Sequence, residues 1–191
     1  MEKIISITAL VSGLICVVLA ARGHIGNFIF GILNSAAYAY IAWLNGLFGE
    51  VGLNLIFFIP VNIAGIFLWK DRILDGTVIM KKMKLMNILY ILAGAFLLTF
   101  LFGWSLSFIA GQNTPYIDAS TNVLSVGAAL LMIFRYREQW LFYILLNILT
   151  VTMWFIRFTE GGNESIMMMW MWVFFFLNSL YGYWNWSRGA E

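Results

Sequence analysis

The chain has 191 residues, 62% of them hydrophobic and only 10% charged, and its mean hydropathy is +0.88. Soluble globular domains are roughly 45–50% apolar and about 25% charged, so this composition excludes a soluble fold and predicts a lipid bilayer as the surroundings. The net charge of +2 comes without a basic stripe, and we expect no nucleic-acid partner. With one cysteine (Cys16) and one histidine (His24), we expect no disulfide, no metal site and no cofactor.

Seven apolar windows are long enough to cross a bilayer as helices, which takes roughly 17–25 residues. They are Ile4–Ala21, Asn27–Leu44, Val51–Trp69, Leu85–Trp104, Asp118–Phe134, Gln139–Ile156 and Ser165–Trp186. We interpret the first as a retained helix and not as a signal peptide, because it is long and Arg22 follows it. The sequence therefore predicts an all-α integral membrane protein with seven transmembrane helices.

The two longest connectors, Lys70–Lys84 and Ser105–Ile117, flank the fourth window. This spacing predicts a first three-helix bundle (1–69), a linker region (70–117) with one helix at about 85–104, and a second three-helix bundle (118–191). Both bundles hold an odd number of helices, so a duplication would be parallel. A shift of 117 positions aligns Gly65 and Trp69 with Gly182 and Trp186, although chance is an alternative explanation for so few matches.

Basic residues predict the orientation in the membrane. Nine of the eleven Lys and Arg residues fall at one end of the windows, and only Lys3 and Arg157 fall at the other. Because cytoplasmic ends carry the excess of positive charge, we expect the N-terminus outside and the C-terminus in the cytoplasm. The nine Trp residues, Trp69, Trp140 and Trp186 among them, lie toward the window ends, where we expect each to anchor its helix at an interface.

Amides inside the windows mark a candidate binding site, because polar groups in lipid usually face the bundle interior. Asn34, Asn62, Asn147 and Asn178 lie near the middle of helices two, three, six and seven. Two interpretations stay open. The amides hold neighbouring helices together, or they line a cavity for an uncharged or weakly charged ring compound.

Three further features bear on transport. Asp118 and Asn122 begin the fifth window, and we expect them to guard the outer mouth of such a cavity. Pro60, beside Asn62, frees a backbone carbonyl, which suits a cavity wall or a hinge. No Asp, Glu, Lys or Arg lies near the middle of a window. Since proton-coupled pumps usually carry an acid there, the sequence predicts a passive uniporter.

Three stretches resemble the PnuC family of bacterial vitamin transporters. They are Phe30–Asn34 with Tyr38, Pro60–Trp69, and the segment from Asp118 through Val123-Leu124-Ser125 to Glu138–Leu141 and Asn147. The resemblance implies a fold similar to the SWEET sugar transporters, with two parallel three-helix bundles, a linker helix and the substrate between the bundles. It also implies facilitated diffusion of nicotinamide riboside, a homotrimer in the bacterial inner membrane, and trapping of the vitamin by a cytoplasmic kinase.

The family's Trp-x-x-Trp pair reads Trp140-Leu-Phe-Tyr143 in this chain. Trp140 and Tyr143 are therefore expected to stack on the substrate. The change to Tyr makes thiamine the second candidate, since a cationic ring would suit an aromatic box of Tyr143, Tyr181, Tyr183 and Trp184. A non-transporting structural or receptor subunit is the alternative from another class. A membrane enzyme comes third, because the sequence offers no catalytic constellation.

Overall fold

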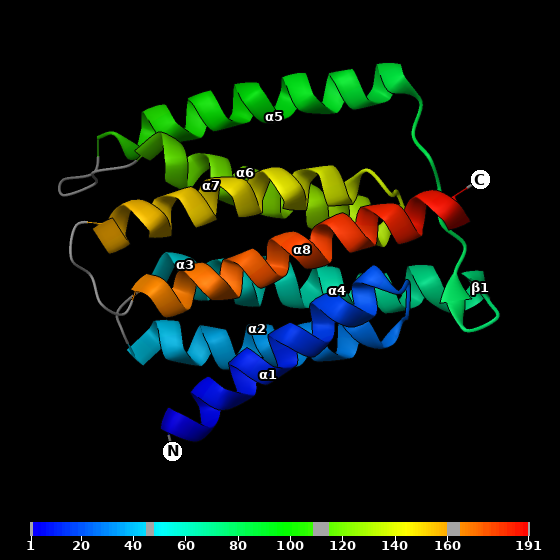
Figure 1. Ribbon diagram of the computed structural model, residues 1–191, viewed down its shortest axis with the longest axis horizontal. Helices are drawn as coiled ribbons and strands as arrows, with labels where there is room; N and C mark the ends of the chain where they lie inside the picture. Colours follow the sequence, from blue (N-terminus) through cyan, green and yellow to red (C-terminus); the bar gives the residue numbers. More distant parts are fainter. Residues whose placement is uncertain (1, 45–47, 109–114, 160–164, 191) are drawn as a thin grey trace.

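The computed structural model describes residues 2–44, 48–108, 115–159 and 165–190, and it confirms the all-helical architecture (Figure 1). Its helices are α1 (Glu2–Ala21), α2 (Gly26–Leu44), α3 (Phe48–Gly52), η1 (Leu53–Phe58), α4 (Ile59–Trp69), η2 (Lys70–Arg72), α5 (Leu85–Leu106), α6 (Pro115–Ile133), α7 (Gln139–Thr159) and α8 (Ser165–Gly189). Because α3, η1 and α4 run on without a break, the described ranges form seven long rods, one for each predicted window. Five of them are long and apolar enough to cross a membrane, and α7 adds a shorter apolar stretch.

The element boundaries differ from the windows mainly around the second connector. Helix α5 continues to Leu106 and α6 begins at Pro115, three positions before the predicted start. Residues 109–114 of this connector lie outside the described part of the chain. Proline is well suited to the first turn of a helix, where its missing N–H costs nothing, and hydropathy alone does not detect that signal.

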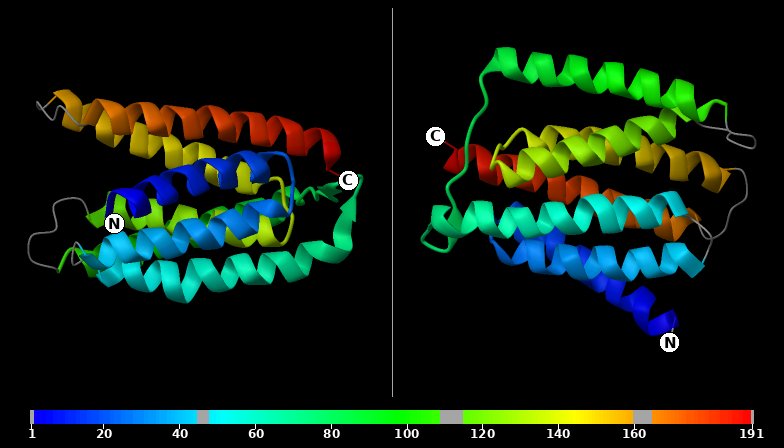
Figure 2. Two further views of the ribbon diagram at one scale, coloured as in Figure 1. Left: turned by 90° about the horizontal axis from the view of Figure 1, so that it is seen from below. Right: turned by 180° about the vertical axis from the view of Figure 1, so that it is seen from behind.

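Six of the rods form a closed ring, and α5 lies outside it. Contacts run from α1 to α2, from α2 to α4, from α4 to α6, from α6 to α7, from α7 to α8, and from α8 back to α1. Helix α5 packs on α6 at the edge of the molecule, as the green helix in Figure 1 and in the right view of Figure 2 shows. Between α4 and α6 the chain therefore leaves the ring, forms the peripheral helix α5, and then returns to the ring.

The third rod changes its winding just before Pro60. Proline cannot donate a backbone hydrogen bond, and the six residues of η1 are wound as a π-helix, in which Ile59 N–H donates to the carbonyl of Asn54. Two amides supply further donors, from Asn54 Nδ2 to Glu50 O and from Asn62 Nδ2 to Phe58 O, both at 2.8 Å. Side-chain amides therefore satisfy backbone carbonyls around the irregular turn.

Residues 70–84, here called the connector, cross the end of the molecule at which the C-terminus lies (Figure 1). They include a short hairpin of β1 (Ile73–Leu74) and β2 (Thr77–Val78). Val78 N–H donates to Gly23 O at 2.9 Å in the α1–α2 turn, and Lys81 N–H donates to Arg135 O at 2.8 Å in the α6–α7 turn. Met80 is buried beneath this crossing. The connector thereby joins the first turns of both halves of the chain, which its composition did not predict.

Three Trp residues at this C-terminal end correct the expectation that each Trp is an interfacial anchor. Trp69 and Trp186 are fully buried and Trp140 is 2% exposed, and all three belong to one core cluster. In contrast, Trp43, Trp104, Trp170 and Trp184 are all more than half exposed, as an anchor requires. The expectation was wrong for the buried three because residues of other helices and of the connector surround them.

Candidate functional site

The predicted amides lie at the seams between neighbouring helices. Asn34 Nδ2 of α2 donates to Ala9 O of α1 at 2.7 Å, and Asn178 Nδ2 of α8 donates to Val17 O of α1 at 3.1 Å. These bonds join rods that are adjacent in the ring but, for Asn178, far apart in the sequence. Helix–helix bonding, one of the two interpretations left open, therefore describes part of what these amides do.

Asn147 and Asn62 are the most deeply buried of the predicted amides, at 3% and 7% exposed. Asn147 Nδ2 of α7 donates to Ser179 Oγ of α8 at 3.2 Å, and that hydroxyl donates in turn to Phe176 O at 2.7 Å. Asn62 Oδ1 lies against Gly31 of α2, so closely that a Cβ at that glycine would come nearer than 3.0 Å. Both amides are thus held in fixed positions on the helices that carry them.

Trp140 and Tyr143 form the aromatic pair that the sequence predicted. Both begin α7, and their rings lie 5.6 Å apart with planes at 48°. The indole N–H of Trp140 is buried and has no hydrogen-bond partner in the described part of the chain. A buried N–H without a partner is uncommon and costly, so Trp140 is a candidate donor to a polar group of a ligand.

Gln139 is a candidate that sequence reasoning missed. It precedes Trp140, is fully buried, and neither its Nε2 nor its Oε1 has a partner among the described residues. Asn27, at the start of α2, is likewise fully buried with an unpartnered Oδ1. The two residues are 112 positions apart, as are Phe28 and Trp140, and this recurrence was the available signal.

Aromatic contacts of the first half recur in the second half. Phe28 meets Trp69 edge to face at 4.7 Å and 79°, and Trp140 meets Trp186 at 6.2 Å and 70°. Each pair joins the start of the second helix of a half to the end of its third. Edge-to-face packing of this kind is worth about 0.5–1.5 kcal/mol beyond the burial of the rings.

Glycines let these aromatic rings approach the third helix of each half. A Cβ at Gly65 would come nearer than 3.0 Å to the Phe28 ring, and a Cβ at Gly182 would do the same to the Trp140 ring. The two glycines are the pair that the 117-position shift aligned. Both glycines therefore allow the same kind of close approach between a helix and an aromatic ring.

Tyr181 and Trp184 lie apart from the Trp140–Tyr143 pair. Tyr181 is 44% and Trp184 is 53% exposed, and their rings contact each other at 6.0 Å. Gly182 lies on the side of α8 that contacts Trp140, so the side chains of Tyr181 and Trp184 lie on another side of this helix. Tyr183 is half-buried and lies under the guanidinium of Arg137 at 5.7 Å. The structure therefore does not bring together the four residues of the expected aromatic box.

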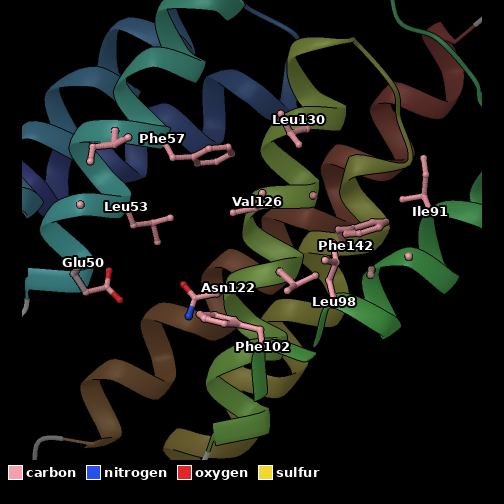
Figure 3. A pocket seen from close by; sticks show the side chains of 16 residues that line it. Glu50, Leu53, Phe57, Ile91, Leu98, Phe102, Asn122, Val126, Leu130 and Phe142 are labelled. Carbon is pink, nitrogen blue, oxygen red and sulfur yellow. The ribbon is translucent and has the colours of Figure 1, made fainter. Parts of the chain in front are cut away.

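Asp118 and Asn122 lie in the first two turns of α6. Asn122 Nδ2 donates to Asp118 O at 2.8 Å. Asn122 also lines a cavity of about 1080 Å³, where it faces Glu50 across the space between the third rod and α6 (Figure 3). The remaining walls of this cavity come from apolar side chains of η1, α5, α6 and α7.

This cavity and the amide seams are different places. Asn122 lines the cavity, but Asn34, Asn62, Asn147, Asn178 and the Trp140–Tyr143 pair do not. Its walls offer few groups that could bind a polar ring compound, whereas the seams and the start of α7 concentrate buried donors and acceptors. We therefore take Trp140, Tyr143, Gln139 and Asn147 as the candidate substrate site, with Asn34, Asn62 and Asn178 placed at neighbouring seams.

Known proteins match nearly the whole chain. A profile of the nicotinamide mononucleotide transporter family matches residues 3–188. The nicotinamide riboside transporter PnuC of Neisseria mucosa is 34% identical over 186 residues, covering 94% of this chain and 70% of that protein. The same transporter of Haemophilus influenzae is 36% identical over 182 residues, covering 93% and 76%. A crystal structure of the vitamin B3 transporter PnuC matches with a TM-score of 0.79 at 33% identity, covering 97% of this chain and 81% of that one.

These matches decide between the classes that the sequence left open. They confirm the resemblance to PnuC transporters and a multi-pass membrane protein that transports, rather than an enzyme or a structural or receptor subunit. The matched length includes the rods that carry every predicted site residue. The chain belongs to the nicotinamide mononucleotide transporter family.

Proposed function

We propose that this chain takes up nicotinamide riboside by facilitated diffusion, with Trp140 and Tyr143 stacking on its pyridinium ring. The observation that carries the proposal is the buried, unpartnered indole N–H of Trp140 beside Tyr143 in a member of this transporter family. Relatives at 34% and 36% identity are nicotinamide riboside transporters. A cationic ring is attracted to aromatic faces, and the amides of Gln139 and Asn147 suit a carboxamide or ribose hydroxyls.

Thiamine is the second candidate, and Tyr143 is the observation that favours it. Tyr143 stands where the resemblance places a second Trp, and it adds a hydroxyl while reducing the stacking area. A thiazolium ring is also cationic, so the same pair of aromatic rings would attract it.

The proposed architecture is two parallel three-helix bundles joined by α5, similar to the SWEET transporters. The order of rods around the ring supports it, because helices α1, α2 and α4 are followed by α6, α7 and α8 in the same sense. The recurring contacts of Phe28 with Gly65 and of Trp140 with Gly182 also support it. In this arrangement the substrate passes between the two bundles.

The proposal also covers how uptake is driven, how the chains assemble and how the protein is oriented in the membrane. The windows carry no charged residue near their middle, which favours a uniporter, with uptake made effectively irreversible when a cytoplasmic kinase phosphorylates the vitamin. The basic residues of the connector end favour a cytoplasmic C-terminus and an outer N-terminus in the bacterial inner membrane. A homotrimer is the assembly that the family resemblance implies.

Calorimetric titration of the purified full-length protein tests the site. Trp140→Phe keeps the aromatic ring and removes the N–H, and we expect it to bind nicotinamide riboside roughly tenfold or more weakly, since such a hydrogen bond is worth about 1–3 kcal/mol. Trp104→Phe, at an exposed position of α5, is the matched control and should bind like the parent protein. Unchanged affinity of Trp140→Phe would refute the assignment, and binding of thiamine alone would favour the second candidate.

A further inference from the structure

Three cations at the C-terminal end are held together by the main chain. Ile79 N–H donates to Arg72 O at 2.8 Å, and Arg135 Nη1 donates to the carbonyl of the same Ile79 at 3.2 Å. Lys81 N–H donates to Arg135 O at 2.8 Å. One set of hydrogen bonds to the main chain therefore links Arg72, Lys81 and Arg135, although the connector and the α6–α7 turn are more than 50 positions apart in the sequence.

The backbone at the α6–α7 turn is specialised for this arrangement. Arg135 has φ 69°, a left-handed conformation that residues with a side chain rarely adopt. Lys81 O accepts the N–H of Arg137 at 3.0 Å, and the Lys81 ammonium lies 5.7 Å from the centre of the Tyr136 ring. Paired backbone bonds and a ring contact thus fix where Lys81 stands relative to Arg135.

The three charges repel one another, and no carboxylate in the described ranges forms an ion pair with any of them. Burial, then Arg135 and then Arg72 lower the pKa of Lys81, and burial followed by Arg72 lowers the pKa of Arg135. The buried carboxylate nearby, Glu138, already accepts from Arg137 Nε and from Met83 N–H, each at 3.1 Å. Among the described residues, none of the three cations has an ion pair.

The preference for basic residues at a cytoplasmic end does not require this convergence. Lys70 and Arg188 lie at the same end and stand apart, over the rings of Phe67 at 5.6 Å and Trp184 at 4.8 Å. Orientation depends on the number of such charges and not on their contact with one another. Holding three of them close together raises the electrostatic energy of the site when it is empty. A bound anion would lower that energy.

We propose that Arg72, Lys81 and Arg135 form a binding site for a phosphate group. Guanidinium groups match two phosphate oxygens at once, and a lysine adds a point charge. The phosphate belongs either to the headgroup of an anionic lipid at the membrane surface or to a free phosphate anion. In both cases the bound anion offsets the repulsion and fixes the connector against the α6–α7 turn. The site is independent of the transported vitamin.

Thermal unfolding of the purified full-length protein tests the proposal at constant ionic strength. The probes are inorganic phosphate against chloride, and mixed micelles of phosphatidylglycerol against phosphatidylcholine. We expect either inorganic phosphate or phosphatidylglycerol to raise the melting temperature of the parent protein. Phosphatidylcholine is the counterpart because its choline group neutralises the charge of its phosphate. Lys81→Met, which keeps the aliphatic stem, should lose the shift, and so should Arg72→Gln, whose side chain is exposed. Lys70→Met is the matched control, since this lysine also stands over a ring, and it should keep the shift.

The outcomes separate the two sources of phosphate. A shift with inorganic phosphate identifies a free anion, and a shift with phosphatidylglycerol alone identifies a lipid headgroup. The proposal is overturned if neither probe stabilises the parent protein more than its counterpart does. It is equally overturned if Lys81→Met and Arg72→Gln retain the shift, or if Lys70→Met loses as much of it as they do.

Discussion

Trp69 and Trp186 lie with ring centres 5.8 Å apart, and each donates its indole N–H to the first helix of the opposite half. Trp69 Nε1 donates to the carbonyls of Met132 and Ile133 at 3.2 Å, and Trp186 Nε1 donates to Ala20 O at 3.0 Å. Both bonds cross between the halves at the C-terminal end. Movement of α4 against α6, or of α8 against α1, at this end requires these bonds to break.

Trp69→Phe is expected to weaken closure at this end of the molecule. The change removes the donor while keeping an aromatic ring, and the loss of a buried hydrogen bond costs about 1–3 kcal/mol. We expect a lower melting temperature and faster exchange of substrate across the membrane, both measured on reconstituted protein. Trp170→Phe, at a 63% exposed position of α8, is the control and should change neither. A melting temperature of Trp69→Phe equal to that of the parent would contradict this role.

Asn147→Leu is expected to abolish uptake while insertion and expression stay normal. Leucine has a similar size but offers neither donor nor acceptor, so affinity should fall roughly tenfold or more. Ser179→Ala separates the two roles of this amide, because it removes the partner of Asn147 and leaves the amide in place. Uptake by Ser179→Ala should remain near that of the parent. If it falls as far as in Asn147→Leu, the amide serves the helix seam and not the substrate.

Gly182→Ala is expected to displace the Trp140 ring and lower transport. A Cβ at this position would come closer than 3.0 Å to the ring, which is buried in a core cluster with Trp186 and Met132. The measurement is substrate affinity together with melting temperature, and both should decrease. Gly94→Ala in α5 adds a Cβ with no atom within 4 Å, so it should be neutral or stabilise the helix by about 1 kcal/mol. Equal behaviour of the two variants would argue against the close packing of Trp140.

Tyr143→Trp is expected to shift preference toward nicotinamide riboside and away from thiamine. The larger indole increases the stacking area, and the tyrosine hydroxyl is lost. The ratio of the two dissociation constants, measured by titration, reports the change independently of protein stability. A ratio equal to that of the parent protein would show that residue 143 does not select the cargo.

The seven rods could be predicted from sequence because the bilayer demands long apolar helices with every backbone group satisfied. The seams were partly predictable as well, since amides in lipid need partners and Asn34, Asn147 and Asn178 found them across helices. The sequence did not predict whether an aromatic residue near a helix end faces the lipid or the interior of the protein. Trp69, Trp140 and Trp186 share the window-end position of interfacial Trp residues, but tertiary contacts with other rods bury them.

Neither the contacts of the connector nor the burial of Gln139 could be predicted from the sequence, and the reasons are related. The pairing of Lys81 with the α6–α7 turn joins segments distant in the chain, and no local pattern encodes it. Gln139 follows the charged Glu138 at a helix start, where polar residues are ordinarily solvated, so its complete burial depends on the surrounding fold. Gln139 lies 112 positions after Asn27. This spacing indicates a buried position for Gln139 only when the structural contacts of the two halves of the chain are compared.

Uptake of labelled nicotinamide riboside into proteoliposomes containing the purified protein tests the central proposal most directly. With the membrane potential held at zero, a facilitator with a saturable site should bring the vitamin to equal concentrations inside and outside. An imposed proton or sodium gradient should not change this result, and Asn147→Leu should abolish the uptake. Accumulation of the vitamin above its external concentration under either gradient would contradict facilitated diffusion, and the absence of saturable uptake would contradict the assigned cargo.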